Sequence, residues 1–74
     1  MYDLTRVIEE SERFLHDEGA EKCRMVNVLE FTDIVLENNL RDKVKVRNFK
    51  IGETPFAQVY LKLNGEYVYS TTII

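Results

Sequence analysis

The sequence predicts an α+β fold in which two N-terminal helices pack on one face of a three-stranded antiparallel β-meander, with residues 1–74 as a single domain. Two observations support this prediction. Apolar residues recur at helical spacing across residues 4–40, and two β-branched and aromatic runs flank Asn64-Gly65. Asn-Gly between such runs indicates a hairpin, because a type I′ turn needs a positive φ at both central residues.

Residues 3–18 have the pattern of an amphipathic helix. Apolar side chains follow an i, i+3, i+4, i+7 stripe, with a serine in its middle: Leu4, Val7, Ile8, Ser11, Phe14 and Leu15. Asp3 is a suitable N-cap, and Gly19 stands where a glycine commonly ends a helix.

Residues 20–40 admit two interpretations. A second helical stripe runs through Met25, Val28, Leu29, Thr32, Val35, Leu36 and Leu40. The alternative is a strand over residues 24–31, where Met25, Asn27, Leu29 and Phe31 alternate with mostly polar or small neighbours. We favour the helix because the segment lacks Gly and Pro and exceeds a typical strand, although its β-branched content weakens that preference. Asn38-Asn39 is the expected stop.

Residues 43–51 are predicted to form the first strand of the meander. Val44 and Val46 share one phase of the alternation, whereas Phe49 and Ile51 share the other. One extra residue near position 47 or 48 would reconcile the two phases, so we expect a β-bulge there. Residues 52–55 then form the turn into the final hairpin.

The two-residue loop at Asn64-Gly65 determines the register of that hairpin. One face should hold the pairs Leu61–Val68, Val59–Ser70 and Ala57–Thr72, which are small or aliphatic and suit a packed helix. The other face should hold Lys62–Tyr67, Tyr60–Tyr69, Gln58–Thr71 and Phe56–Ile73.

This second face is a candidate interface. Its apolar and aromatic members are Phe56, Tyr60, Tyr67, Tyr69 and Ile73. Tyrosine combines an apolar ring with a hydroxyl that can remain hydrated, and it is enriched at interfaces. The residues could form a half-exposed cross-strand ladder, or contact a second copy or another protein, or lie beneath the second helix.

Composition limits the class of protein. The chain has a formal net charge of −3 and is 45% hydrophobic, which is typical of a soluble globular domain. Its one cysteine, Cys23, excludes an internal disulfide and suits a reducing compartment. We find no apolar signal region and no apolar run long enough for a membrane span, so we expect a cytoplasmic protein.

The sequence contains no pattern that points to catalysis. His16 has no ligand-forming neighbour four residues away, and Cys23 has no CxxC partner. Glu9, Glu10 and Glu12 are typical of a solvated helix face. No glycine-rich phosphate loop is present. We therefore expect no enzyme, no catalytic residue, no metal and no cofactor.

Nucleic acid is the strongest alternative partner to protein. Lys43, Lys45 and Arg47 alternate along the first strand, and Lys62 is expected to adjoin them near the tyrosines. The acidic net charge leads us to expect no useful affinity at physiological salt. Residues 56–65 also resemble the central strands of double-stranded RNA-binding domains. That family depends on a basic C-terminal helix which this sequence does not contain, so we do not assign the chain to it.

The pattern as a whole favours a small non-enzymatic protein that binds another protein or itself, with a homodimer as the expected state. Accessory and regulatory proteins of this size include inhibitors carried by phages and mobile elements. The alternative is a nucleic-acid-binding or transcription-regulating module that uses residues 43–47 and the sheet tyrosines.

Overall fold

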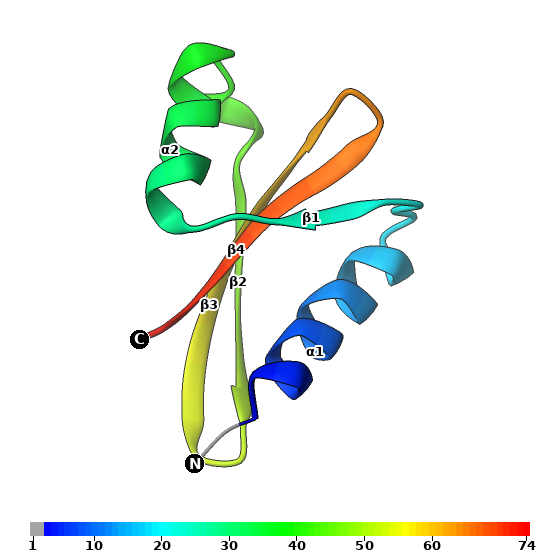
Figure 1. Ribbon diagram of the computed structural model, residues 1–74, viewed down its shortest axis with the longest axis vertical. Coiled ribbons are helices and arrows are strands. Elements are labelled where there is room, and N and C mark those ends of the chain that lie inside the picture. The colour runs from blue at the N-terminus through cyan, green and yellow to red at the C-terminus, as the bar shows by residue number, and fades with distance from the viewer. Residues whose placement is uncertain (1–2) are drawn as a thin grey trace.

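The computed structural model describes residues 3–74 as two helices, a short 3₁₀ helix and one mixed sheet of four strands (Figure 1). The elements follow the order α1 (Leu4–Asp17), β1 (Cys23–Met25), α2 (Val28–Glu37), η1 (Arg41–Lys43), β2 (Lys45–Ile51), β3 (Thr54–Leu63) and β4 (Glu66–Ile73). The strand order in the sheet is β1-β4-β3-β2. The α+β class is confirmed, but the three-stranded antiparallel sheet is corrected to four strands, because β1 pairs parallel to β4.

The first helix begins and ends close to the positions that the sequence predicted. The Asp3 side chain accepts a hydrogen bond of 2.9 Å from the backbone N–H of Thr5, which satisfies one of the free donors of the first turn. Gly19 follows the helix with a φ of +98°, a conformation that costs glycine little. Val7, Ser11 and Leu15 are buried, as the stripe predicted.

Residues 20–40 contain both elements that the sequence left as alternatives. Cys23–Met25 forms β1, and α2 begins only at Val28. The Asn27 side chain caps α2 by accepting a hydrogen bond of 2.8 Å from the Glu30 N–H, which separates the strand from the helix. Asn39 has a φ of +55° and follows the helix end, so the predicted stop at Asn38-Asn39 is confirmed.

The predicted hairpin register is confirmed. Leu63 faces Glu66, Leu61 faces Val68 and so on outward, around a turn in which Asn64 and Gly65 have φ values of +51° and +83°. The predicted bulge is wrong, because β2 pairs with β3 in unbroken register from Lys45–Tyr60 to Ile51–Thr54. Lys43 belongs to η1 and not to the strand.

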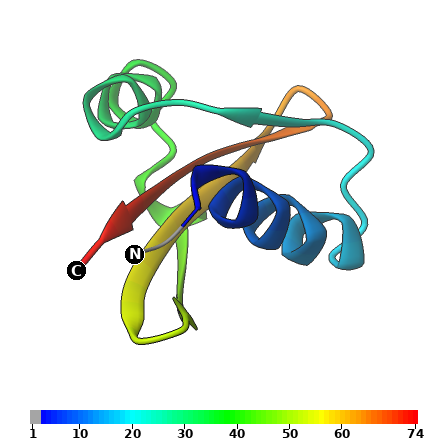
Figure 2. The same ribbon diagram turned by 60° about the horizontal axis from the view of Figure 1, so that its bottom comes forward.

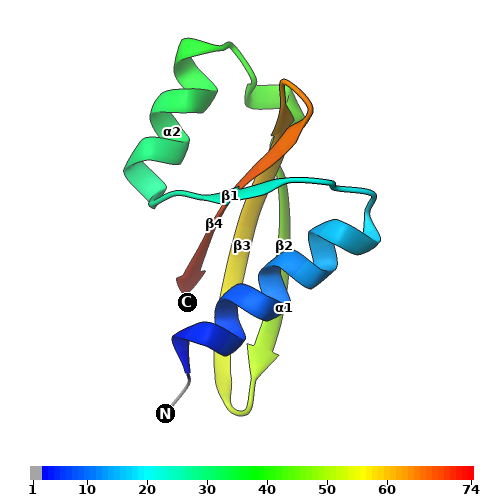
Figure 3. The ribbon, with the colours of Figure 1, turned by 45° about the vertical axis from the view of Figure 1, so that its right-hand side comes forward.

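The two helices lie on opposite faces of the sheet, and the expectation of one shared face is therefore corrected (Figures 2 and 3). Phe31 and Val35 of α2 pack against Leu61 and Val68, whereas Leu15 of α1 packs against Tyr60 and Tyr69. Leu61 and Tyr60 are consecutive residues of β3, so their side chains point to opposite faces.

Each helix covers its face of the sheet with the apolar side that its sequence pattern defines. On the aliphatic face, Phe31 and Val35 of α2 are the buried helix residues, with Ile34 packed beside them. On the aromatic face, Leu15 and Phe14 of α1 pack against the tyrosines, as the close packing of protein interiors requires.

Leu61 tests the assignment of the α2 face. It is 1% exposed in the cluster beneath α2, so Leu61→Ala should lower the free energy of unfolding by about 2–5 kcal/mol in urea denaturation. Leu36→Ala, at a side chain that is 55% exposed, is the matched control and should cost less than about 1 kcal/mol. Equal losses in the two variants would contradict the assignment.

Candidate binding surfaces

A seam of buried polar groups holds α1 on the sheet. The Gln58 side chain is fully buried, and its Nε2 donates a hydrogen bond of 3.1 Å to the backbone carbonyl of Ser11. Gln58 Oε1 accepts a bond of 2.7 Å from Arg47 Nε, while Arg47 Nη2 donates to the Glu10 carbonyl at 3.1 Å. The Ser11 and Thr71 hydroxyls lie 2.8 Å apart. These contacts join the middle of α1 to three strands.

Arg47 belongs to this seam and is not a free surface cation. Its guanidinium carbon lies 4.0 Å from the ring centre of Phe14 and 4.5 Å from that of Phe49. Burial lowers the pKa of Arg47, and the nearby Glu10 carboxylate acts in the opposite direction. The structure therefore separates Arg47 from the basic residues with which the sequence grouped it.

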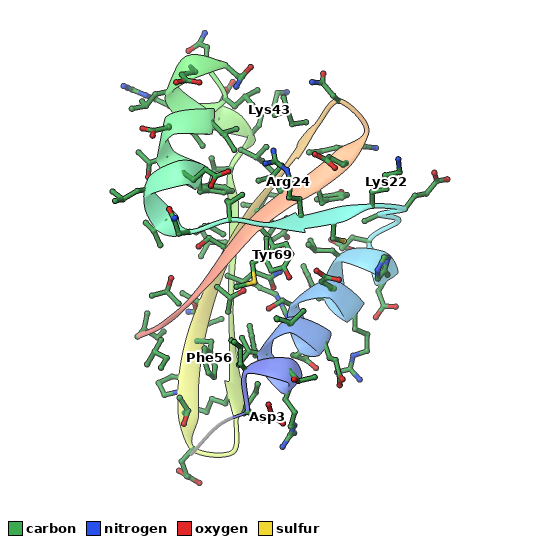
Figure 4. All side chains as sticks on the ribbon, in the orientation of Figure 1. Asp3, Lys22, Arg24, Lys43, Phe56 and Tyr69 are labelled. Atoms are coloured by element: carbon green, nitrogen blue, oxygen red, sulfur yellow. The ribbon has the colours of Figure 1, made fainter. Side chains whose placement is uncertain are left out.

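The aromatic face lies beneath α1, and not beneath the second helix as one of the sequence-based alternatives had it. Phe56 is 2% exposed, Tyr60 6% and Tyr69 0%. Figure 4 labels Phe56 and Tyr69, which lie alongside α1 in that view. The Tyr69 hydroxyl donates a hydrogen bond of 2.8 Å to Glu12 Oε2 on α1. Burial, followed by this hydrogen bond, raises the pKa of Tyr69. Only Ile73 is exposed among the predicted interface residues, and Tyr67 is half-buried.

A basic cleft remains open on the same sheet face, at the hairpin end. It has a volume of ≈ 240 Å³, and its lining combines three lysines with two tyrosines and a leucine: Lys43, Lys45, Tyr60, Leu61, Lys62 and Tyr67. We call it the lysine cleft. It brings together three of the four predicted nucleic-acid contacts and two of the five predicted interface residues.

A second exposed surface lies on α2. Leu29, Leu36 and Val28 are 79%, 55% and 50% exposed, although they are apolar. They fall on one side of the helix, since positions 28, 29, 32 and 36 are neighbours at helical spacing. We call Val28, Leu29, Thr32 and Leu36 the α2 flank. The sequence placed these residues in the helical stripe, but periodicity alone did not show which part of the stripe the sheet would cover.

The remaining reactive side chains have local partners. His16 is exposed, and its Nδ1 lies 2.8 Å from the Ala20 carbonyl. Burial, with a smaller effect of Glu12, raises the pKa of the Cys23 thiol. Within residues 3–74 no group of three His, Cys, Asp or Glu side chains is arranged to hold a metal ion. Over the same residues, no helix has the length and apolar character needed to span a membrane.

Comparison with protein-family models gives no match, and comparisons with curated proteins and with solved structures give no significant similarity. The two surfaces described above are therefore the basis for a functional proposal.

Gln58 tests the polar seam. Gln58→Ala leaves the Arg47 Nε–H and the Ser11 carbonyl without their partner, so the free energy of unfolding should fall by at least about 2 kcal/mol. Asn48→Ala removes an exposed side-chain amide from β2 and should change it by less than about 0.5 kcal/mol. Urea denaturation of both variants checks this prediction, and a loss no larger than that of Asn48→Ala would contradict it.

Tyr69 predicts a dependence of stability on alkaline pH. In the unfolded chain a tyrosine titrates near 10.0, whereas the folded state keeps Tyr69 protonated to higher pH. The contribution of Tyr69 is therefore complete below pH 10.0 and is lost above it, because deprotonation favours the unfolded chain.

The measurement is urea denaturation of wild type and Tyr69→Phe across this pH range. The stability advantage of the wild type should be constant at neutral pH and should shrink above about pH 10. An advantage that stays constant through the alkaline range would show that Tyr69 titrates normally.

Proposed function

We propose that this chain is a non-enzymatic accessory or regulatory protein that binds another protein, and that the α2 flank is its contact surface. The observation that supports the proposal is the exposure of Leu29 and Leu36, at 79% and 55%, on a helix whose opposite side is already packed. An amphipathic helix that presents apolar side chains at this spacing suits an apolar groove on a partner.

The charges beside the flank specify the kind of partner. Glu30, Asp33 and Glu37 occupy the remaining exposed side of α2. Glu30 forms an ion pair of 3.5 Å with Arg24, but neither Asp33 nor Glu37 has a basic partner within ion-pair distance in residues 3–74. A groove with an apolar floor and a basic rim would complement this helix in both respects.

The same charges disfavour antiparallel self-association through α2. Two copies of the helix paired antiparallel would set their acidic sides along the same edge of the interface, where like charges repel. The aromatic surface that the sequence suggested for a homodimer is covered by α1. We therefore propose a different protein as the partner, and we expect the isolated chain to be a monomer in light scattering.

The test is affinity capture from nuclease-treated extracts of cells that carry the gene, with matched variants. Leu29→Lys with Leu36→Lys should reduce capture of the partner at least about tenfold, because burial of each leucine contributes about 1.5–3 kcal/mol. Leu4→Lys with Val46→Lys makes the same change at side chains that are 60% and 61% exposed elsewhere, and it should leave capture unchanged.

Two results would contradict the proposal. One is that the wild type and both double variants capture the same protein equally well, or that a protein captured from untreated extract is lost after nuclease treatment. The other is a dimer of the isolated chain that the Leu29 and Leu36 substitutions dissociate, since a second copy would then be the occupant of the flank.

A further inference from the structure

The lysine cleft has the charge of an anion site. Lys43, Lys45 and Lys62 come from η1, β2 and β3, and all three are exposed. In the described part of the chain none of them forms an ion pair. A cleft lined by charges of one sign focuses their field, so three lysines without an acid in the lining give a local positive potential.

Comparison with the other grooves of the molecule supports this view. The groove lined by Arg6, Arg13 and Lys50 also contains Glu9 and Glu10, which offset its charge. The groove beside the start of α2 contains Glu30. The lining of the lysine cleft contains no acid.

Acidic residues near the cleft are directed elsewhere or lie outside its lining. Glu66 pairs across the hairpin with Leu63, on the α2 face, and its carboxylate lies 3.2 Å from Arg24 Nε. Glu18, at the end of α1, is near enough to influence Tyr60 electrostatically, and Asp42 precedes Lys43 in η1, but neither carboxylate lines the cleft. The local balance is therefore positive, although the chain as a whole carries −3.

The tyrosines give the cleft an aromatic wall. The rings of Tyr60 and Tyr67 lie 6.2 Å apart at 46°, and Tyr60 is held in place by an edge contact with Phe14. Tyr60 is buried, but Tyr67 is only half-buried, so the Tyr67 ring is the one that a ligand can contact. Lysines beside an accessible aromatic ring are the combination that binds single-stranded nucleic acid.

We propose that the lysine cleft binds single-stranded nucleic acid, with backbone phosphates at Lys43, Lys45 and Lys62 and one base against Tyr67. The cleft volume of ≈ 240 Å³ is smaller than the pockets that enclose whole small molecules, which favours a strand that passes over it. Lysine binds phosphate as a point charge, and the nearby Arg47 is already engaged in the polar seam, so the three lysines supply the charge of the cleft. The proposal is independent of the α2 flank, which lies on the other face of the sheet.

The net acidity of the chain limits the affinity but does not prevent binding. At physiological salt the screening length is about 8 Å, so distant carboxylates contribute little within the cleft. Three phosphate contacts on a single strand give a salt slope of about −2, and affinity should therefore fall about tenfold between about 50 and 150 mM salt. Binding is expected to be readily measured only at the lower salt.

The test is fluorescence anisotropy of a labelled oligothymidylate of about 12 nucleotides, a length within the site sizes of single-strand binding proteins. A triple variant with Lys43→Gln, Lys45→Gln and Lys62→Gln should lose at least about tenfold in affinity and most of its salt dependence. Tyr67→Leu should lose at least about fivefold and keep the salt slope, because it removes stacking but no charge. The matched control, Arg6→Gln with Arg13→Gln and Lys50→Gln, removes three cations from the other groove and should bind as the wild type does.

Thermal melting of each variant establishes that it is folded, and chemical-shift changes in the wild type on oligonucleotide addition should centre on residues 43–45, 62 and 67. The proposal is overturned by the absence of saturable binding at about 50 mM salt, or by equal losses in the two triple variants. It is also overturned if polyglutamate displaces the oligonucleotide at equal charge and Tyr67→Leu has no effect, since the site would then take an acidic peptide.

Discussion

The buried contact between Arg47, Gln58 and the backbone of α1 is the constraint on which the rest of this structure depends. A buried amide and a half-buried guanidinium each need hydrogen-bond partners, and here the carbonyls of Ser11 and Glu10 supply them. These contacts can form only if α1 lies across the aromatic face. The position of α1 in turn covers Phe56, Tyr60 and Tyr69.

Both open surfaces follow from that placement. Because α1 covers the middle of the aromatic face, the hairpin end of that face remains accessible, and the lysines and Tyr67 gather there. Because α1 occupies one face, α2 must cover the other face alone. Phe31, Ile34 and Val35 make the contacts of α2 with the core on that face. The side chains of the α2 flank therefore remain exposed to solvent.

The two surfaces differ in chemistry and in position, so one chain could contact two partners at once. The α2 flank combines apolar side chains with acids, whereas the lysine cleft combines cations with an aromatic ring. Each surface would repel the kind of partner that suits the other. Like-charge juxtaposition is an effective means of excluding wrong partners, so the two proposals together assign a distinct specificity to each surface.

The sequence alone determined the features that depend on local chemistry. The Asn64-Gly65 turn and the strand alternation specified every pair of the hairpin, and Asp3, Gly19 and Asn39 marked the helix ends, because backbone conformation there is a property of the residue itself. Three features depended on contacts between distant residues: the parallel pairing of Cys23–Met25 with β4, the face that each helix covers, and the burial of Arg47. Periodicity shows that a helix has an apolar side, but not which sheet face it will meet. Only the tertiary structure decided that, through the packing of Leu15 and Phe14 against the tyrosines and the hydrogen bonds of one buried amide.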